Sequence, residues 1–164
     1  MPALPRDLGD QVRAALAEDI GSGDVTAALV PAAQQVRGRA ITREAAVLCG
    51  VAWVTETFRQ LDPAVQLSWQ VSDGATVSPE QVLFEIEGPA RAVLTGERTA
   101  LNFLQLLSGV ATVARTFADA VAGTANWTSV SSTRATGWAK VRSRLHRDIP
   151  RAGHCSPDEP LTRP

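Results

Sequence analysis

The sequence predicts an α+β fold, in which helices pack on one side of an open-faced, mostly antiparallel sheet and a long helical segment follows. Short runs of alternating apolar and polar residues, typical of half-buried strands, occur between residues 35 and 87. Apolar residues at helical spacing occur on both sides of these runs, most strongly over residues 90–122. The apolar faces of sheet and helices need each other for burial, so both are assigned to one domain, residues 1–124.

The first predicted element is an amphipathic helix over residues 5–19, with Gly21 as its stop. A loop, GSGD, follows at residues 21–24, and Asp24 is expected to cap a short helical turn over residues 25–29. Paired glycines can also cradle a phosphate, but such loops follow a strand, and no strand is predicted here. The turn-and-cap interpretation is therefore preferred.

The next elements form the sheet and one helix that interrupts it. Strands are predicted over residues 35–42, 45–49, 65–71 and 82–87, with a further short strand before a turn at residues 78–80. The intervening helix, residues 51–61, ends at Asp62 because the residue before a proline disfavours helix. Within VQLSWQV, alternation predicts one shared face for Val65, Leu67, Trp69 and Val71.

The hairpin region of residues 72–87 also resembles half of a biotinyl or lipoyl carrier domain. Such a carrier needs a lysine at an exposed hairpin tip to receive the cofactor. No lysine precedes Lys140 in this chain, so the modified-carrier function is excluded. The likeness is kept as a hint about architecture alone.

The last predicted element is the long helix, running to about Val121 with a bend near Thr95 and Gly96, and Gly123 follows its end. Its apolar residues recur at helical spacing and extend around much of the circumference. The central stripe consists of Leu94, Leu101, Leu104, Leu107 and Val110. A helix of this character is expected to be packed inside a protein.

Arg98 places a charge at the start of this apolar run. Glu97 precedes it, the Thr99 hydroxyl follows it, and the Asn102 amide comes one turn later. From these residues alone, two interpretations stand: a solvated arginine near the helix start, paired with Glu97 or another carboxylate, or an arginine available to a ligand. The solvated arginine is the commoner case.

Length and composition restrict the class of protein. A chain of 164 residues with 45% apolar and 20% charged residues suits one soluble domain with a core and is too short for two ordinary domains. It contains no apolar run long enough to span a membrane, and its first residues do not read as a secretion signal. Cys49 and Cys155 form no disulfide framework, so we expect a reducing, cytoplasmic location.

The character of the chain changes near residue 124. Residues 1–124 hold 9 basic and 14 acidic side chains, a net charge of −5, whereas residues 125–164 hold 7 and 3, a net charge of +4. The basic tail lacks a nucleic-acid-binding motif, so no nucleic-acid partner is expected. It also lacks periodicity and contains prolines at 150, 157, 160 and 164, which predicts a divergent, poorly ordered segment. His146, His154 and Cys155 complete no metal site.

Three segments resemble one family in its own order along the chain: EDIGSGDVTAALVP at residues 18–31, LDP at 61–63 and GERTALNFLQLLSGVAT at 96–112. They are similar to the amino-terminal half of quinolinate phosphoribosyltransferase, the carboxylating nicotinate-nucleotide pyrophosphorylase. The resemblance covers about residues 8–124, and it is specific because three separate segments match.

The resemblance implies a pentosyltransferase that joins quinolinate to phosphoribosyl pyrophosphate, with loss of pyrophosphate and carbon dioxide, giving nicotinate mononucleotide for NAD biosynthesis. It implies Mg²⁺ bound with phosphoribosyl pyrophosphate, and a homodimer in which Arg98 contacts a quinolinate carboxylate in the neighbouring subunit's site. Arg134, in STRAT at residues 132–136, is a second candidate, although Ala135 stands where the family has a lysine. No other substrate-binding, catalytic or metal-binding residue is assigned.

The family continues into an α/β barrel that carries its remaining functional residues. Such a barrel takes about 250 residues and one strand-helix-strand unit about 30, so residues 125–164 hold at most the start of an incomplete barrel. Two hypotheses follow. The chain is an enzyme of this family that is expected to be catalytically incomplete, or it is a non-catalytic, truncated fragment that keeps the amino-terminal fold and its dimerisation surface.

Overall fold

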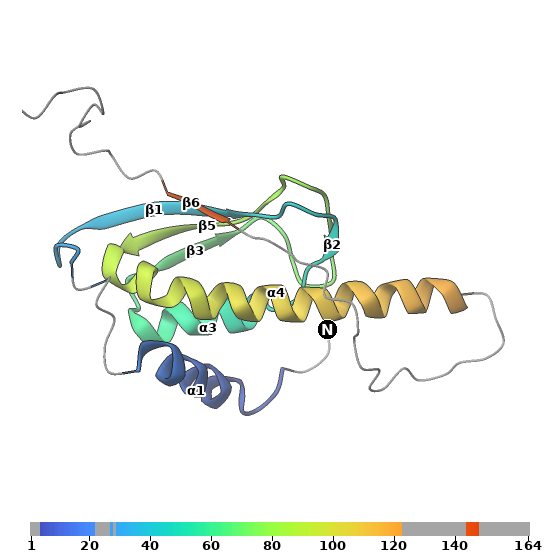
Figure 1. The fold of residues 1–164 in the computed structure, drawn as a ribbon, viewed down its shortest axis with the longest axis horizontal. Helices are drawn as coiled ribbons and strands as arrows, with labels where there is room; N and C mark the ends of the chain where they lie inside the picture. Colours follow the sequence, from blue (N-terminus) through green and yellow to red (C-terminus); the bar gives the residue numbers. More distant parts are fainter. Residues whose placement is uncertain (1–3, 22–26, 28, 123–143, 148–164) are drawn as a thin grey trace, which may run out of the picture.

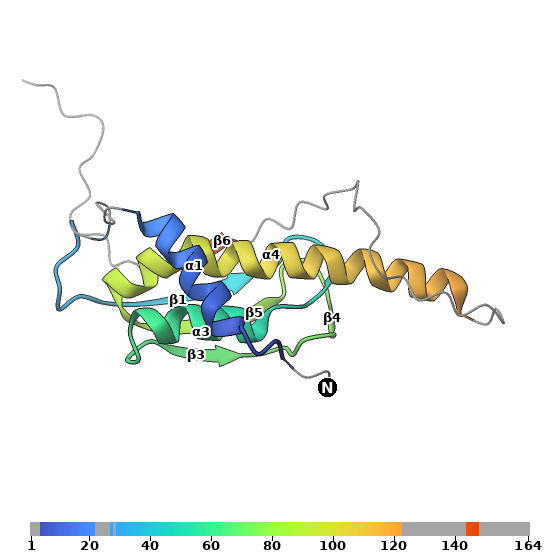
Figure 2. The same cartoon turned by 90° about the horizontal axis from the view of Figure 1, so that it is seen from below.

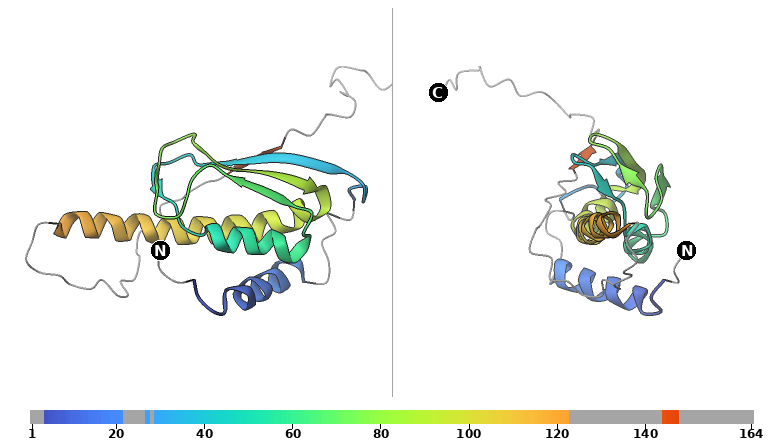
Figure 3. Two further views of the ribbon diagram at one scale, coloured as in Figure 1. Left: turned by 180° about the vertical axis from the view of Figure 1, so that it is seen from behind. Right: turned by 90° about the vertical axis from the view of Figure 1, so that its right-hand side faces the viewer.

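The α+β fold with an open-faced sheet is confirmed by the computed structural model, which describes residues 4–21, 27, 29–122 and 144–147. The described elements form three layers (Figure 1). The sheet is the first layer, helices α3 (Val51–Leu61) and α4 (Ala90–Val121) form the second, and α1 (Leu8–Ile20) lies beneath them. The end-on view in Figure 3 shows the same order, with α1 crossing below α3 and α4.

The main sheet has four antiparallel strands in the order β3-β5-β1-β6. Their bounds are Gln66–Trp69 for β3, Val82–Pro89 for β5, Gln35–Ile41 for β1 and Arg144–Arg147 for β6. Strands β2 (Ala46–Val47) and β4 (Thr76–Val77) form a separate two-stranded sheet. The sequence predicted every strand except β6, which comes from the tail and pairs with the edge of β1.

The helix boundaries follow local signals in the sequence. Helix α3 has the predicted bounds, and α1 begins three residues later than the predicted start at residue 5. The division of the chain at residue 124 stays a prediction, because most of the tail and the loop at residues 22–26 lie outside the described residues. None of the helices in the described ranges combines the length and apolar character that crossing a membrane requires.

Strand β5 runs through the middle of the core. Its register against β1 shifts between Ala40 and Ile41, where Phe84 pairs with Ala40 and Val82 with Ile41. The shift leaves Leu83 as the extra residue of a bulge, so the consecutive side chains Leu83 and Phe84 are both buried. Phe84 lies 4.6 Å from Trp69, measured between ring centroids, in a tilted arrangement.

Both helices of the middle layer contribute to the same core as the sheet. Its buried apolar residues from strands, loops and helices include Ala40, Leu48, Val54, Phe58, Val77, Leu83, Phe84, Ile86, Val93, Ala100 and Leu104. The predicted shared face of β3 is confirmed, because Val65, Leu67, Trp69 and Val71 pack against this cluster. The core therefore lies between the sheet and the α3–α4 layer.

The buried stripe of α4 differs from the predicted one. Leu104 is buried as expected, but its neighbours in the core are Val93 and Ala100. Val110, expected in the stripe, is 54% exposed. It lies about 200° around the helix from both Ser108 and Thr112, which contact Cys49 and β2, so it faces away from them. The far end of α4 continues past the main sheet (Figures 1 and 2). Which apolar residues of α4 are covered depends on which side of the helix faces the sheet. The sequence alone does not reveal that side.

The predicted bend at Thr95 and Gly96 does not interrupt α4, which runs as one helix from Ala90 to Val121. Gly96 has a different purpose. A Cβ atom built there would lie 2.7 Å from both Leu61 Cδ1 and Phe58 Cε1. Gly96 therefore lets α3 approach α4 more closely than any residue with a side chain would permit.

Two hydroxyl groups of α4 form hydrogen bonds with the backbone of residues 47–49, as a neighbouring strand would otherwise do. Thr112 Oγ1 accepts a hydrogen bond of 2.9 Å from the Val47 amide. Ser108 Oγ accepts one of 3.0 Å from the Cys49 amide and donates one of 3.1 Å to the Cys49 carbonyl. The intervening Leu48 bonds the opposite way, its amide donating to Ala75. The backbone groups of this edge are thereby satisfied.

Candidate functional site

Arg98 lies in the first third of α4, on the side of the helix turned away from the core. Its side chain is exposed, whereas the adjacent Thr99 and Ala100 are buried. Within the residues that the structure describes, the Arg98 guanidinium makes no hydrogen bond or ion pair. A planar guanidinium without a partner can bind a carboxylate through two parallel hydrogen bonds.

The Thr99 side chain connects α4 to α1. It is only 1% exposed, and its hydroxyl donates a hydrogen bond to Oδ2 of Asp19, in the last turn of α1. A hydrogen bond to a charged acceptor is stronger than one between neutral groups. The residue directly after Arg98 is therefore fixed to a second helix.

Helix α1 is also held against α3 by side-chain hydrogen bonds. Trp53 Nε1 donates to Gln11 Oε1 over 3.1 Å, and Gln60 Nε2 donates to the Gly9 carbonyl over 2.8 Å. Glu56 accepts hydrogen bonds from Arg59 and Gln60, and these lower the pKa of its carboxyl to about 2. Side-chain hydrogen bonds therefore connect α1 to both α3 and α4.

A pocket of about 210 Å³ opens between α1 and α4 next to this contact. Its lining combines carboxylate, hydroxyl and amide groups with apolar side chains, namely Ala15, Glu18, Asp19, Thr99, Asn102, Phe103 and Leu106. Two of its groups are carboxylates, which repel anions. An anionic ligand is therefore expected to contact the Arg98 side of α4 rather than this pocket.

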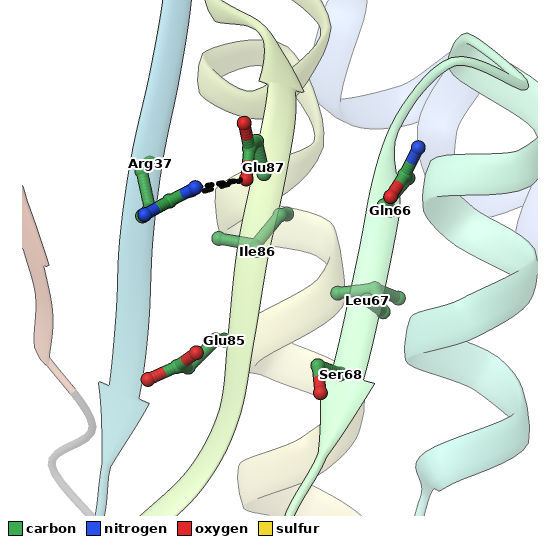
Figure 4. A pocket seen from close by; sticks show the side chains of 7 residues that line it. All are labelled: Arg37, Gln66, Leu67, Ser68, Glu85, Ile86 and Glu87. Atoms are coloured by element: carbon green, nitrogen blue, oxygen red, sulfur yellow. Dashed lines mark hydrogen bonds and ion pairs between the residues drawn. The ribbon is translucent and has the colours of Figure 1, made fainter.

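A second hollow, of about 270 Å³, lies on the outer face of the sheet (Figure 4). Arg37 on β1 donates to Glu87 Oε2 from Nε over 3.1 Å and from Nη2 over 2.7 Å, and this pairing raises the pKa of Arg37. Glu85 and Ser68 line the same hollow. Because Arg37 is already paired and Glu85 adds another negative charge, this face does not suit a polyanionic substrate.

Cys49 is not placed for nucleophilic chemistry. It is half-buried and free, and burial raises the pKa of its thiol, with a smaller contribution from the charge of Asp73. The Asp73 carboxylate itself accepts hydrogen bonds from the Gly50 and Val51 amides at the start of α3. Cys49 therefore has a structural role, in agreement with the small buried hydrophobe that the sequence suggested.

Several predicted positions cannot be compared with the structure. Arg134, Asp24, His154 and Cys155 lie outside the described residues, and only the backbone of His146 is described, as part of β6. No group of three or more His, Cys, Asp or Glu side chains that could hold a metal occurs in the described ranges.

The contact between Thr99 and Asp19 was not predicted from the sequence, because 80 residues separate the two. No local signal in the sequence pairs them, although both residues lie in segments on which the family resemblance depends.

Comparisons with known proteins match most of the part of the chain that the structure describes. The family model described as the quinolinate phosphoribosyl transferase N-terminal domain matches residues 24–108. The decarboxylating quinolinate phosphoribosyltransferase 1 of Nicotiana glauca is 34% identical over 122 residues, which are 73% of this chain and 35% of that protein. A probable carboxylating nicotinate-nucleotide pyrophosphorylase of Bacillus subtilis is 38% identical over 98 residues, 60% of this chain and 34% of that protein.

The fold agrees with solved structures over the same region. The nicotinate-nucleotide pyrophosphorylase of Francisella tularensis superposes with a TM-score of 0.70 at 40% identity, covering 74% of this chain and 44% of that one. Both the sequences and the structure match over most of the described residues. The chain spans about a third of the length of the curated relatives that it matches.

Proposed function

Because this chain belongs to the quinolinate phosphoribosyltransferase family through its amino-terminal domain, we propose that it serves the reaction of that family. The reaction transfers a phosphoribosyl group from phosphoribosyl pyrophosphate to quinolinate, with decarboxylation, and gives nicotinate mononucleotide for NAD biosynthesis. The relatives named above are pyrophosphorylases and phosphoribosyltransferases of this kind.

The observation that carries the proposal is the state of Arg98. Its guanidinium is exposed and makes no ion pair in the described part of the chain, while the neighbouring Thr99 is fixed. Quinolinate is a dicarboxylate, and each charged hydrogen bond to it is worth roughly 1.5 to 3 kcal/mol. We assign Arg98 to one of the two carboxylates.

The proposed partner is a second subunit, in whose site Arg98 contacts quinolinate. Helix α4 supports this arrangement, because Leu106, Val110 and Phe117 are 49%, 54% and 46% exposed. Apolar side chains repeated along one helix and left in water indicate a surface that other protein covers. A homodimer is therefore part of the proposal, and no nucleic-acid or membrane partner is included.

Mg²⁺ is proposed to arrive with phosphoribosyl pyrophosphate, whose oxygens it binds. The described residues contain no cluster of carboxylates that fits this ion, so no step is assigned to it here. Arg134 stays a second proposed contact to substrate. The proposed location is the cytoplasm, as the cysteine content suggests.

A second candidate function is a domain without turnover. The small number of lysines favours it. The two substrates together carry two carboxylates, a phosphate and a pyrophosphate, which need several positively charged side chains, and the chain contains a single lysine, Lys140. In that case the domain would retain its fold and its surface for dimerisation.

The test is the formation of nicotinate mononucleotide from quinolinate, phosphoribosyl pyrophosphate and Mg²⁺ by the pure chain and by Arg98→Ala. The exposed Arg98 should contribute less than about 0.5 kcal/mol to stability, so urea unfolding provides the folding control. Turnover that is lost in Arg98→Ala would support the proposal. Equal turnover in both proteins would refute the role of Arg98, and no turnover in either would favour the non-catalytic domain.

A further inference from the structure

The hydrogen bond between Thr99 and Asp19 has properties that packing of α1 alone does not require. Asp19 is exposed, so its carboxylate could be satisfied by water, yet it accepts a hydrogen bond from a hydroxyl whose residue is 1% exposed. The contact lies beside the pocket between α1 and α4 and directly after the arginine assigned to substrate. It is thus placed to affect that arginine.

The link to Arg98 is geometric. Successive residues of an α-helix are about 100° apart around its axis, so fixing the direction of Thr99 also fixes the direction in which Arg98 leaves the helix. In the described part of the chain no side chain holds the Arg98 guanidinium itself. Its approach to a ligand is therefore set through the backbone, and the next residue of the helix, Thr99, has its side chain fixed by Asp19.

We propose that Asp19 is a positioning residue: by holding Thr99, it fixes the rotation of α4 at Arg98 and so the direction from which the guanidinium meets a quinolinate carboxylate. The inference rests on the proposed role of Arg98. Asp19 itself touches no substrate. A misplacement of about 1 Å in such a contact is enough to weaken binding strongly.

The test compares quinolinate affinity among variants of the full chain. Binding is measured by NMR, from the change in the Nε–Hε signal of Arg98 as quinolinate is added. Thr99→Val removes the hydroxyl at nearly constant volume, Asp19→Ala removes the acceptor from an exposed position, and Thr99→Ser restores the donor. The matched control is Gln11→Leu, which removes the hydrogen bond from Trp53 and loosens α1 from α3 without changing α4.

We expect Thr99→Val and Asp19→Ala to weaken quinolinate binding about 10-fold, since orientation is lost while the guanidinium is kept. Thr99→Ser and Gln11→Leu should bind as the unchanged chain does. The inference is overturned if Asp19→Ala binds normally. It is also overturned if Gln11→Leu loses as much affinity, because general docking of α1 would then be sufficient.

If neither the unchanged chain nor any variant binds quinolinate, the proposed function is refuted. The positioning role of Asp19 is then tested without a ligand. Hydrogen exchange of the Arg98 amide, together with the order parameter of its Nε–Hε group, reports whether the local direction of α4 is fixed. Asp19→Ala should accelerate that exchange and lower that order parameter, while Gln11→Leu should not. Unchanged values in Asp19→Ala would refute the positioning role independently of any ligand.

Discussion

Replacing Gly96 by alanine is expected to destabilise the protein, although alanine is the better helix former. In an open helical position the exchange gains about 1 kcal/mol. At Gly96 the new Cβ would lie 2.7 Å from the Phe58 ring and from Leu61 Cδ1, and Phe58 is 3% exposed within the core. Overpacking of this kind costs about 1 to 3 kcal/mol, so we expect a net loss of about 1 kcal/mol.

The same helix supplies a matched control. A Cβ atom at Gly109 would meet nothing within 4 Å, so Gly109→Ala should gain the full helix-propensity term of about 1 kcal/mol. Urea unfolding followed by circular dichroism gives both free energies, and an unchanged m-value shows that the unfolded states are comparable. The two variants should differ by about 2 kcal/mol, with opposite signs relative to the unchanged chain.

Two results would refute this reasoning. If Gly96→Ala stabilises the protein as much as Gly109→Ala, the close approach of α3 to α4 does not limit residue 96. If the loss is real but comes from elsewhere, shortening the neighbour in Leu61→Ala will not reduce it. A double-mutant cycle between residues 61 and 96 measures that coupling directly.

Two further predictions concern hydrogen bonds. Ser108→Ala should lower the free energy of unfolding by about 1 to 3 kcal/mol, because the Cys49 amide and carbonyl lose their partner, whereas Thr116→Ala, whose hydroxyl bonds only within α4, should change little; urea unfolding distinguishes them. Since the folded pKa of Glu56 lies at about 2 and its ordinary value is 4.5, its stabilising effect is present above pH 4.5 and is lost as the pH falls towards 2. The full pKa shift corresponds to about 3 kcal/mol, but Arg59 is 67% exposed, so we expect a contribution of about 1 kcal/mol to stability. The measurement is the difference in unfolding free energy between the unchanged chain and Glu56→Gln, which should disappear near pH 2. A difference that persists at that pH would contradict the assignment.

Local signals in the sequence were sufficient for the order and type of most elements. Gly50 before α3 and Asp62-Pro63 after it are strong punctuation, and the bounds of that helix were predicted correctly. The alternation in VQLSWQV likewise identified the buried face of β3. These predictions succeeded because each depends on residues only a few positions apart.

The failures concern relations between distant segments. The contact of Gly96 with Phe58 and Leu61 on another helix was missed, because it is not visible in the local sequence. Val110 was assigned to the buried stripe because periodicity alone does not show which side of α4 faces the sheets. The role of Arg98 stays a prediction: within the described residues its guanidinium has no partner, and the ligand proposed for it is a second molecule that no pattern in the sequence reveals.

The two hydroxyl groups of Ser108 and Thr112 match the spacing of residues along a helix to that along an extended chain. Four residues of helix rise about 6.0 Å and two residues of extended chain about 6.6 Å, so Ser108 and Thr112 match alternate amides of the strand, at Cys49 and Val47. A slip of the helix by one residue would rotate both hydroxyls away together. These hydrogen bonds therefore fix the position of α4 along its own axis relative to residues 47–49. Arg98 lies about 15 Å from Ser108 on the same helix, so its position along that axis is fixed by the same bonds.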